Sequence, residues 1–261
     1  MFEGLYNSAS GMVTQGKIQE VISGNIAKAV IPGYKRIVPV VKSFDRELDI
    51  SLKESRLLND QVGGADVSRY HTVFEAGNMK ATENPLDLAI EGEGFFTINI
   101  NDNEYYTRNG RFSINNEGQL VTPEGYLVMG DGGPIEIIDG NETNPAVTRR
   151  INISSTGDIS IQVAGQNNER KVGKLKIVMF EDISKLQSLG QSVFTAGRGS
   201  DPQIMDRPRI AQGYVEESNV NILDEMVSMI ANMRIYETNQ RALSNMSNAY
   251  NRSINEIGRV S

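Results

Sequence analysis

The sequence feature that most constrains the fold is an unbroken heptad pattern near the C-terminus. Between residues 222 and 257 the pattern advances in alternating steps of four and three over five heptads. Such a pattern is typical of a helix that packs against a partner helix, and at 1.5 Å per residue this helix would be roughly 55 Å long. A long helix that packs only on its own domain is the alternative interpretation. The positions are Ile222, Met226, Met229, Met233, Tyr236, Gln240, Leu243, Ser247, Tyr250, Ile254 and Ile257.

A second helix is predicted near the N-terminus, over about residues 4–29. Small and apolar residues recur there at helical spacing, and a Pro-Gly pair at residues 32–33 ends the pattern. Glycines inside a helix cost roughly 1 kcal/mol each relative to alanine, so three of them weaken this helix by about 3 kcal/mol. The helix therefore needs support from outside, and glycine lets another backbone approach closely. The three glycines are Gly11, Gly16 and Gly24.

The region between the two helices, about residues 66–215, has the pattern of a β domain. Short alternating runs, such as residues 95–100 and 174–180, are separated by turn residues. Strand-like runs at this spacing, joined by Asn-Gly and Glu-Gly pairs, indicate antiparallel hairpins. The predicted turns include Asn109-Gly110, Glu117-Gly118, Glu124-Gly125 and Thr156-Gly157.

These patterns predict an α+β protein in three parts. Residues 1–35 and 216–261 are assigned to a terminal helical domain of coiled-coil type. Residues 66–215 are assigned to a β-rich antiparallel outer domain, and residues 36–65 to a linker or arm whose structure the sequence leaves open.

Composition excludes several kinds of chemistry. The chain has no cysteine and one histidine, His71, so neither a thiolate nucleophile nor a site of several histidines is available. Its net charge of −7 argues against a nucleic-acid-binding protein. Glu91 and Glu93 flank a glycine in a predicted turn, where exposed carboxylates are ordinary. We therefore predict a structural protein that is not an enzyme, with no catalytic, cofactor or metal site.

Neither a cleaved signal peptide nor a membrane span is predicted. The first ten residues contain an acid where a signal peptide needs basic residues, and polar residues interrupt any apolar core. No run approaches the 18 apolar residues of a transmembrane helix.

Four groups of residues follow one another along the chain: residues 23–36 (SGNIAKAVIPGYKR), residues 84–96 with 106–112 (NPLDLAIEGEGFF and YTRNGRF), residues 213–221 (GYVEESNVN) and residues 234–239 (RIYETN). Together these groups resemble motifs of the bacterial flagellar rod and hook protein family. The third group resembles the segment leading into the family's C-terminal helix, and the fourth resembles the core of that helix. Lys28 and Ile31 depart from the family, which commonly has Asn and Thr there.

The resemblance implies an axial subunit of the flagellar basal-body rod, exported by the type III apparatus without a cleaved signal peptide and assembled in the periplasm. It implies that the rod transmits torque from the motor to the hook. The chain length fits both the proximal and the distal rod protein and is too short for a typical hook protein. The charged stretch at residues 42–64 lacks the aromatic string of distal rod members, so the resemblance favours the proximal rod protein, with the distal rod protein as the alternative. A secreted adhesin or translocator with a coiled-coil stalk is the alternative from another class.

The implied partners are other rod subunits, the surrounding ring proteins and the export apparatus. Apolar residues of the two helical patterns, together with one asparagine of the first motif, are predicted to form the subunit interface. They are Leu5, Met12, Ile22, Asn25, Ile26, Ile222, Met226, Met229, Met233, Tyr236, Leu243, Tyr250 and Ile254.

Overall fold

A computed structural model describes residues 2–43, 64–137, 149–163, 169–197 and 199–257. The chain divides into two compact units, which are described separately below. The helical unit comprises residues 1–27, 37–73 and 221–261, and the β unit comprises residues 28–36 and 74–220. The predicted α+β class is confirmed, with one helix near each end of the chain and antiparallel strands between them.

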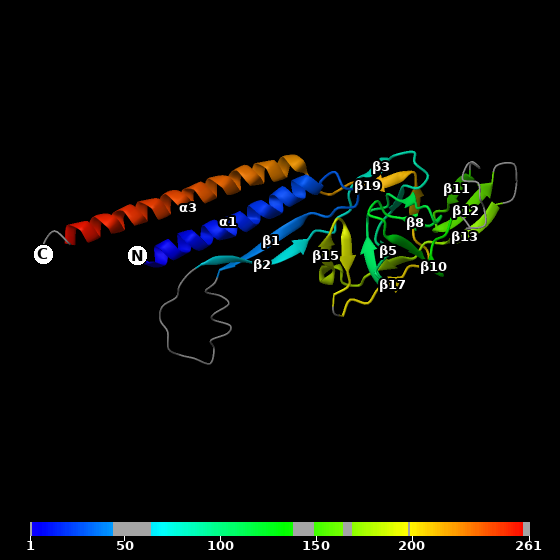
Figure 1. The fold of residues 1–261 in the computed structure, drawn as a ribbon, viewed down its shortest axis with the longest axis horizontal. Helices are drawn as coiled ribbons and strands as arrows, with labels where there is room; N and C mark the ends of the chain where they lie inside the picture. Colours follow the sequence, from blue (N-terminus) through cyan, green and yellow to red (C-terminus); the bar gives the residue numbers. More distant parts are fainter. Residues whose placement is uncertain (1, 44–63, 138–148, 164–168, 198, 258–261) are drawn as a thin grey trace. The chain divides into compact units, whose positions relative to one another are not determined.

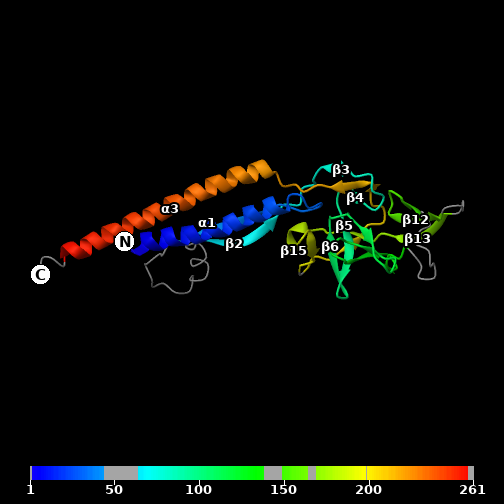
Figure 2. The same cartoon turned by 45° about the horizontal axis from the view of Figure 1, so that its top comes forward.

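The helical unit contains helix α1 (Phe2–Lys28), helix α3 (Ile222–Ile257) and a two-stranded ribbon of β1 (Ile37–Ser43) and β2 (Ala65–Thr72). The two helices lie side by side and run in opposite directions in both ribbon views (Figures 1 and 2). Helix α3 begins where the Asn221 side chain accepts the N–H of Leu223 at 3.1 Å, which is the N-cap geometry that this residue type favours. Among the described residues, neither helix is long and apolar enough to cross a membrane.

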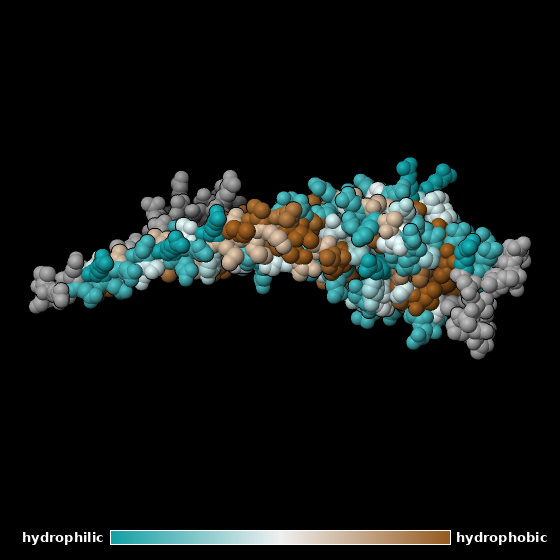
Figure 3. All heavy atoms as spheres, turned by 90° about the horizontal axis from the view of Figure 1, so that it is seen from above, coloured by the Kyte–Doolittle hydropathy of each residue, from teal (hydrophilic) through white to brown (hydrophobic). Residues whose placement is uncertain are grey.

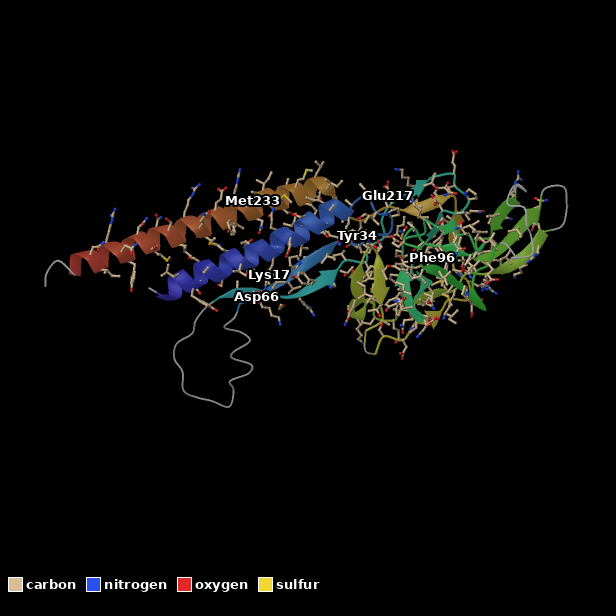
Figure 4. All side chains as sticks on the ribbon, viewed as in Figure 1. Lys17, Tyr34, Asp66, Phe96, Glu217 and Met233 are labelled. Carbon is tan, nitrogen blue, oxygen red and sulfur yellow. The ribbon has the colours of Figure 1, made fainter. Side chains whose placement is uncertain are left out.

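The ribbon is attached to α1 by polar contacts. The Thr14 hydroxyl donates to the carbonyl of Ala65 at 2.6 Å. Lys17 pairs with Asp66 at 2.6 Å, and Figure 4 shows these two side chains meeting where α1 faces β2. Strand β1 lies in the segment that the sequence left open, residues 36–65, and β2 begins at the last residue of that segment, Ala65. Residues 44–63 of the segment lie outside the described residues.

The β unit is built from antiparallel pairs. Its largest sheet has the order β15-β16-β6-β5-β9-β8-β7, with β10, β14 and β17 attached beside this path. A three-stranded sheet β11-β12-β13 and the pairs β18-β4 and β19-β3 complete it. The strands are β3 (Met79–Ala81), β4 (Leu88–Ile90), β5 (Phe95–Ile100), β6 (Asn103–Thr107), β7 (Ser113–Ile114), β8 (Leu120–Val121), β9 (Leu127–Gly130), β10 (Gly133–Pro134), β11 (Arg149–Ile153), β12 (Asp158–Val163), β13 (Glu169–Lys174), β14 (Ile177–Met179), β15 (Gln187–Gly190), β16 (Val193–Thr195), β17 (Gln203–Ile204), β18 (Ile210–Gln212) and β19 (Tyr214–Glu216), with a short 3-10 helix η1 (Ile183–Lys185) before β15.

The hydrophobic core lies inside the β unit. One cluster is centred on Phe96, whose ring packs edge-on against Phe112 at 5.1 Å between centroids. A second cluster gathers aromatic rings around Phe95. Figure 4 labels Phe96 among the side chains of this unit. The β unit therefore carries the apolar burial that a stable domain needs.

Three of the predicted turns have the expected backbone. Gly118, Gly125 and Gly157 have φ values of 80°, 90° and 87°, in the region that glycine adopts at no steric cost. The predicted turn at Asn109-Gly110 is wrong. Gly110 has no such φ, and it is paired closely with Leu88, whose N–H donates to the Gly110 carbonyl at 2.9 Å. Glycine is needed there for a close approach of two backbones, and an Asn-Gly pair alone does not distinguish this role from a hairpin turn.

Candidate assembly interface

Helix α3 exposes a large apolar surface in its first half. Leu223, Val227 and Ile230 have exposed fractions of 72%, 67% and 54%, and Met233 is 52% exposed. Figure 3 shows hydrophobic residues gathered over this part of the helix. A contiguous exposed apolar surface is typical of a site that contacts another protein, a membrane or a ligand. The exposed large apolar residues of α3 are Ile222, Leu223, Met226, Val227, Ile230, Met233, Ile235, Tyr236, Tyr250 and Ile254, here called the α3 apolar surface.

The contact between α1 and α3 contains buried polar groups. Asn25 Nδ2 lies 3.3 Å from Glu225 Oε2, and both residues are only 1% exposed. Asn232, 6% exposed, donates to the Gln15 carbonyl and to Gln19 Oε1, each at 2.9 Å. Buried polar groups that satisfy one another in this way fix the register of two helices, but they contribute little hydrophobic stabilisation.

Apolar burial in the helical unit is correspondingly slight. Among the described residues of this unit, Ile22 is the one hydrophobic side chain that is buried, whereas both hydrophobic clusters belong to the β unit. At about 25 cal/mol per Å² of buried apolar area, a helix pair with so little burial gains little from packing on itself. The two helices therefore lack a core of their own.

The structure places the predicted interface residues in three groups. Ile22 and Asn25 are buried within the helical unit. Most of the α3 positions are exposed and available to a partner: Ile222, Met226, Met233, Tyr236, Tyr250 and Ile254. The rest are partly covered: Leu5, Met12, Ile26, Met229 and Leu243.

Sequence reasoning missed part of the surface. Leu223, Val227 and Ile230 follow one another at helical spacing of four and three, a second apolar row beside the heptad pattern. This spacing was the signal that could have identified them. The stronger heptad pattern concealed it, because both rows lie on the same turns of α3.

A groove of about 380 Å³ lies between α1 and α3, lined by residues that include Gly16, Gln19, Met233 and Tyr236. A Cβ atom built on Gly16 would meet nothing within 4 Å, whereas one on Gly11 would lie 3.0 Å from Asn239 Nδ2. The close contact with Asn239 of α3 thus explains why position 11 is a glycine. Gly16 has no such contact with the described residues, and it lines the groove.

No cluster in the described part of the chain has the composition of a metal site. Within those residues there is no group of three or more His, Asp or Glu side chains that could hold an ion. Glu91 and Glu93 are exposed beside Gly92, whose φ is 98°. This agrees with the interpretation of that pair as part of a turn.

Comparison with known protein families gives two matches. The family model described as "Flagellar hook protein FlgE/F/G D1 domain" matches residues 89–161, within the β unit. The family model described as "Flagellar basal body rod FlgEFG protein C-terminal" matches residues 211–256, which include most of α3.

Curated relatives match along nearly the whole chain. The flagellar basal-body rod protein FlgG of Buchnera aphidicola subsp. Acyrthosiphon pisum is 33% identical, over 94% of this chain and 95% of that protein. FlgG of Borreliella burgdorferi is 32% identical, over 95% and 96% of the two chains. The flagellar basal-body rod protein FlgF of Caulobacter vibrioides is 30% identical, over 100% of both chains.

Proposed function

The chain belongs to the flagellar basal-body rod protein family and is a structural rod subunit, and we propose that the α3 apolar surface and the α1–α3 groove are where neighbouring subunits pack. The observation that carries this proposal is the lack of a hydrophobic core in the described part of the helical unit, together with the large apolar side chains exposed on α3. Burial of these side chains against neighbours would supply the missing stabilisation. The β unit, which has its own core, would form the outer layer.

The assembly implied by this surface is a filament. A contact between two different surfaces of identical subunits does not close on itself unless the rotation happens to complete a ring, and it otherwise propagates along an axis. The groove beside Gly16 and the row of Leu223, Val227 and Ile230 are two such surfaces on one helical unit. Dense helix packing around an axis would resist twisting, which suits a rod that transmits torque from motor to hook.

The family places the chain in the flagellar basal body. Within it we propose a periplasmic position, after export by the type III apparatus without cleavage of the N-terminus. Retention of the N-terminal segment is supported by α1, because residues Phe2–Lys28 supply the partners of Asn232 and Glu225 on α3. Contacts with surrounding ring proteins are proposed for the β unit.

Among rod proteins we propose the proximal one. FlgF, the proximal rod protein, matches over the full length of both chains in Caulobacter vibrioides. The distal rod protein is the second candidate, and it is favoured by the FlgG relatives, which reach 33% identity. Residues 42–64, on which the sequence-based preference for the proximal protein depended, lie mostly outside the described residues.

Deletion of the gene, followed by electron microscopy of isolated basal bodies, tests this proposal. We expect basal bodies that keep the inner rings but lack most of the rod. A rod that is present up to its distal part would instead assign the chain to the distal position. Intact basal bodies with a complete rod would contradict the proposed function, and complementation with the wild-type gene is the control.

A further inference from the structure

Three charged side chains from distant parts of the sequence meet inside the β unit. Lys35 Nζ lies 2.6 Å from Glu216 Oε1, and Arg108 Nη1 lies 3.6 Å from Glu216 Oε2. The side chains of Lys35, Arg108 and Glu216 are 0%, 7% and 3% exposed. We call these two cations and one carboxylate the ion cluster.

The polar surroundings of the ion cluster hold each group in place. Lys35 Nζ also donates to the Glu75 carbonyl at 2.6 Å, and Glu216 Oε1 also accepts the N–H of Gly77 at 3.0 Å. The Arg108 guanidinium donates to the Gly92 carbonyl at 2.5 Å. These contacts satisfy part of the hydrogen-bonding capacity of the cluster, while Arg108 Nε and Glu216 Oε2 are buried without a hydrogen-bond partner. Backbone groups bring no net charge, so the two cations still need a carboxylate.

Glu216 supplies that charge. Burial lowers the pKa of Lys35 from its ordinary value, and the neighbouring Glu216 carboxylate opposes this shift. Burial likewise lowers the pKa of Arg108, which Glu216 opposes first and the exposed Glu93 second. Glu216 is thus the carboxylate that favours the charged form of both buried cations.

The ion cluster joins the segments through which the chain passes into and out of the β unit. Lys35 belongs to residues 28–36, Glu75 and Gly77 begin the long segment 74–220, and Glu216 lies near the end of that segment. Two further hydrogen bonds join the same segments: the backbone N–H of Gly33 donates to the Glu216 carbonyl at 2.7 Å, and the backbone N–H of Arg36 donates to the side-chain oxygen Asn219 Oδ1 at 2.8 Å. Figure 4 labels Tyr34 and Glu217, the sequence neighbours of the central pair.

We propose that Glu216 is a positioning residue that closes the β unit, because its carboxylate is the counter-charge for two buried cations delivered by other parts of the chain. Lys35 and Glu216 are separated by 181 positions, so the pair forms only when the segment after α1 and the segment before α3 are both in place. Two buried cations without a carboxylate are strongly unfavourable. The fold of the β unit therefore depends on both the segment that follows α1 and the segment that precedes α3. This inference concerns the β unit alone and does not rest on the proposed rod function.

The charges predict that two substitutions will lower the stability of the β unit by unequal amounts. Glu216→Gln preserves size and shape but leaves Lys35 and Arg108 buried without a contacting carboxylate. Lys35→Met changes shape more but leaves one cation facing one carboxylate, so the charges balance. A role in packing alone would rank the two variants in the opposite order, with the isosteric Gln substitution the milder one.

The test compares full-length variants by chemical denaturation, with near-ultraviolet circular dichroism as the signal from the β unit. We expect Glu216→Gln to lower the folding equilibrium constant by about a hundredfold or more, since breaking a buried pair is strongly destabilising. We expect Lys35→Met to have an effect at least about tenfold smaller. If Glu216→Gln does not fold, the double variant Lys35→Met/Glu216→Gln decides, because it leaves Arg108 as the single cation of the cluster without a contacting carboxylate and should recover part of the folded protein.

Glu217→Gln is the matched control. Glu217 is the next residue, and its ion pair with Lys80 spans 3.8 Å between side chains that are 46% and 66% exposed. The control should unfold at the same denaturant concentration as the wild type, because an exposed ion pair contributes little to folding stability. Wild-type stability of Glu216→Gln, an equal or greater loss in Lys35→Met, or a double variant less stable than Glu216→Gln would each overturn the proposal.

Discussion

Replacing Met233 by aspartate is expected to abolish incorporation of the subunit into the rod while the β unit stays folded. Met233 is 52% exposed in the isolated chain, so the new carboxylate is hydrated there and the chain tolerates it. In the proposed interface the same carboxylate would be buried without a partner, which costs several kcal/mol, and about 1.5–3 kcal/mol of apolar burial would be lost as well. Swimming motility and the presence of the variant in purified basal bodies measure the effect.

Asn245→Asp is the matched control for this experiment. It adds the same charge to an exposed position on the same helix, 12 residues beyond Met233 and outside the first half of α3 where the exposed apolar residues gather. We expect the control variant to assemble. Normal motility with Met233→Asp, at wild-type levels of the variant in the rod, would show that the α3 apolar surface is not the interface.

The largest effect on the β unit is expected from Gly110→Ala. A Cβ atom at Gly110 would lie 1.6 Å from the carbonyl oxygen of Leu88, which is backbone and cannot turn aside. The segment around Gly110, between β6 and β7, would have to move away from β4, opening the core beside Leu88 and Phe96. We expect a loss of about 4 kcal/mol or more, in the range that marks a broken structural feature, and hence little folded protein.

Gly173→Ala serves as the control for that prediction. Gly173 lies in β13, and a Cβ atom there would meet nothing within 4 Å. Thermal unfolding monitored by circular dichroism should show the control near the wild type and Gly110→Ala largely unfolded. A cooperative transition in Gly110→Ala within a few degrees of the wild type would mean that the two backbones are not held as close as the structure indicates.

The helices and the fold class could be predicted from the sequence because their signals are long and regular. Five heptads identify α3, and a Pro-Gly pair marks the end of α1. The face of α3 that meets α1 was harder to predict from the sequence. Glu225 and Asn232 are buried there, but polar residues in a helical pattern are ordinarily assigned to solvent. Only the partner side chains, Asn25 and Gln19, show that these polar groups are satisfied inside the contact.

The ion cluster could not be predicted from the sequence for a related reason. Lys35, Arg108 and Glu216 each lie in a group of residues that carries the family resemblance, yet lysine, arginine and glutamate are rarely buried unless paired. Their pairing spans 181 positions and depends on the complete sheet topology. Local patterns carry no information about contacts of this kind, so charge type alone assigns all three residues to the surface.

Hydrogen exchange of the dilute, full-length monomer, compared with assembled rods, tests the central claim most directly. Few buried apolar contacts imply low local stability, so amides of α1 and α3 should exchange rapidly in the monomer while those of β5 and β6 are strongly protected. In rods the amides of both helices should become protected. Strong protection of both helices in the dilute monomer, equal to that of β5, would contradict the claim that neighbouring subunits supply the core that the helical unit lacks.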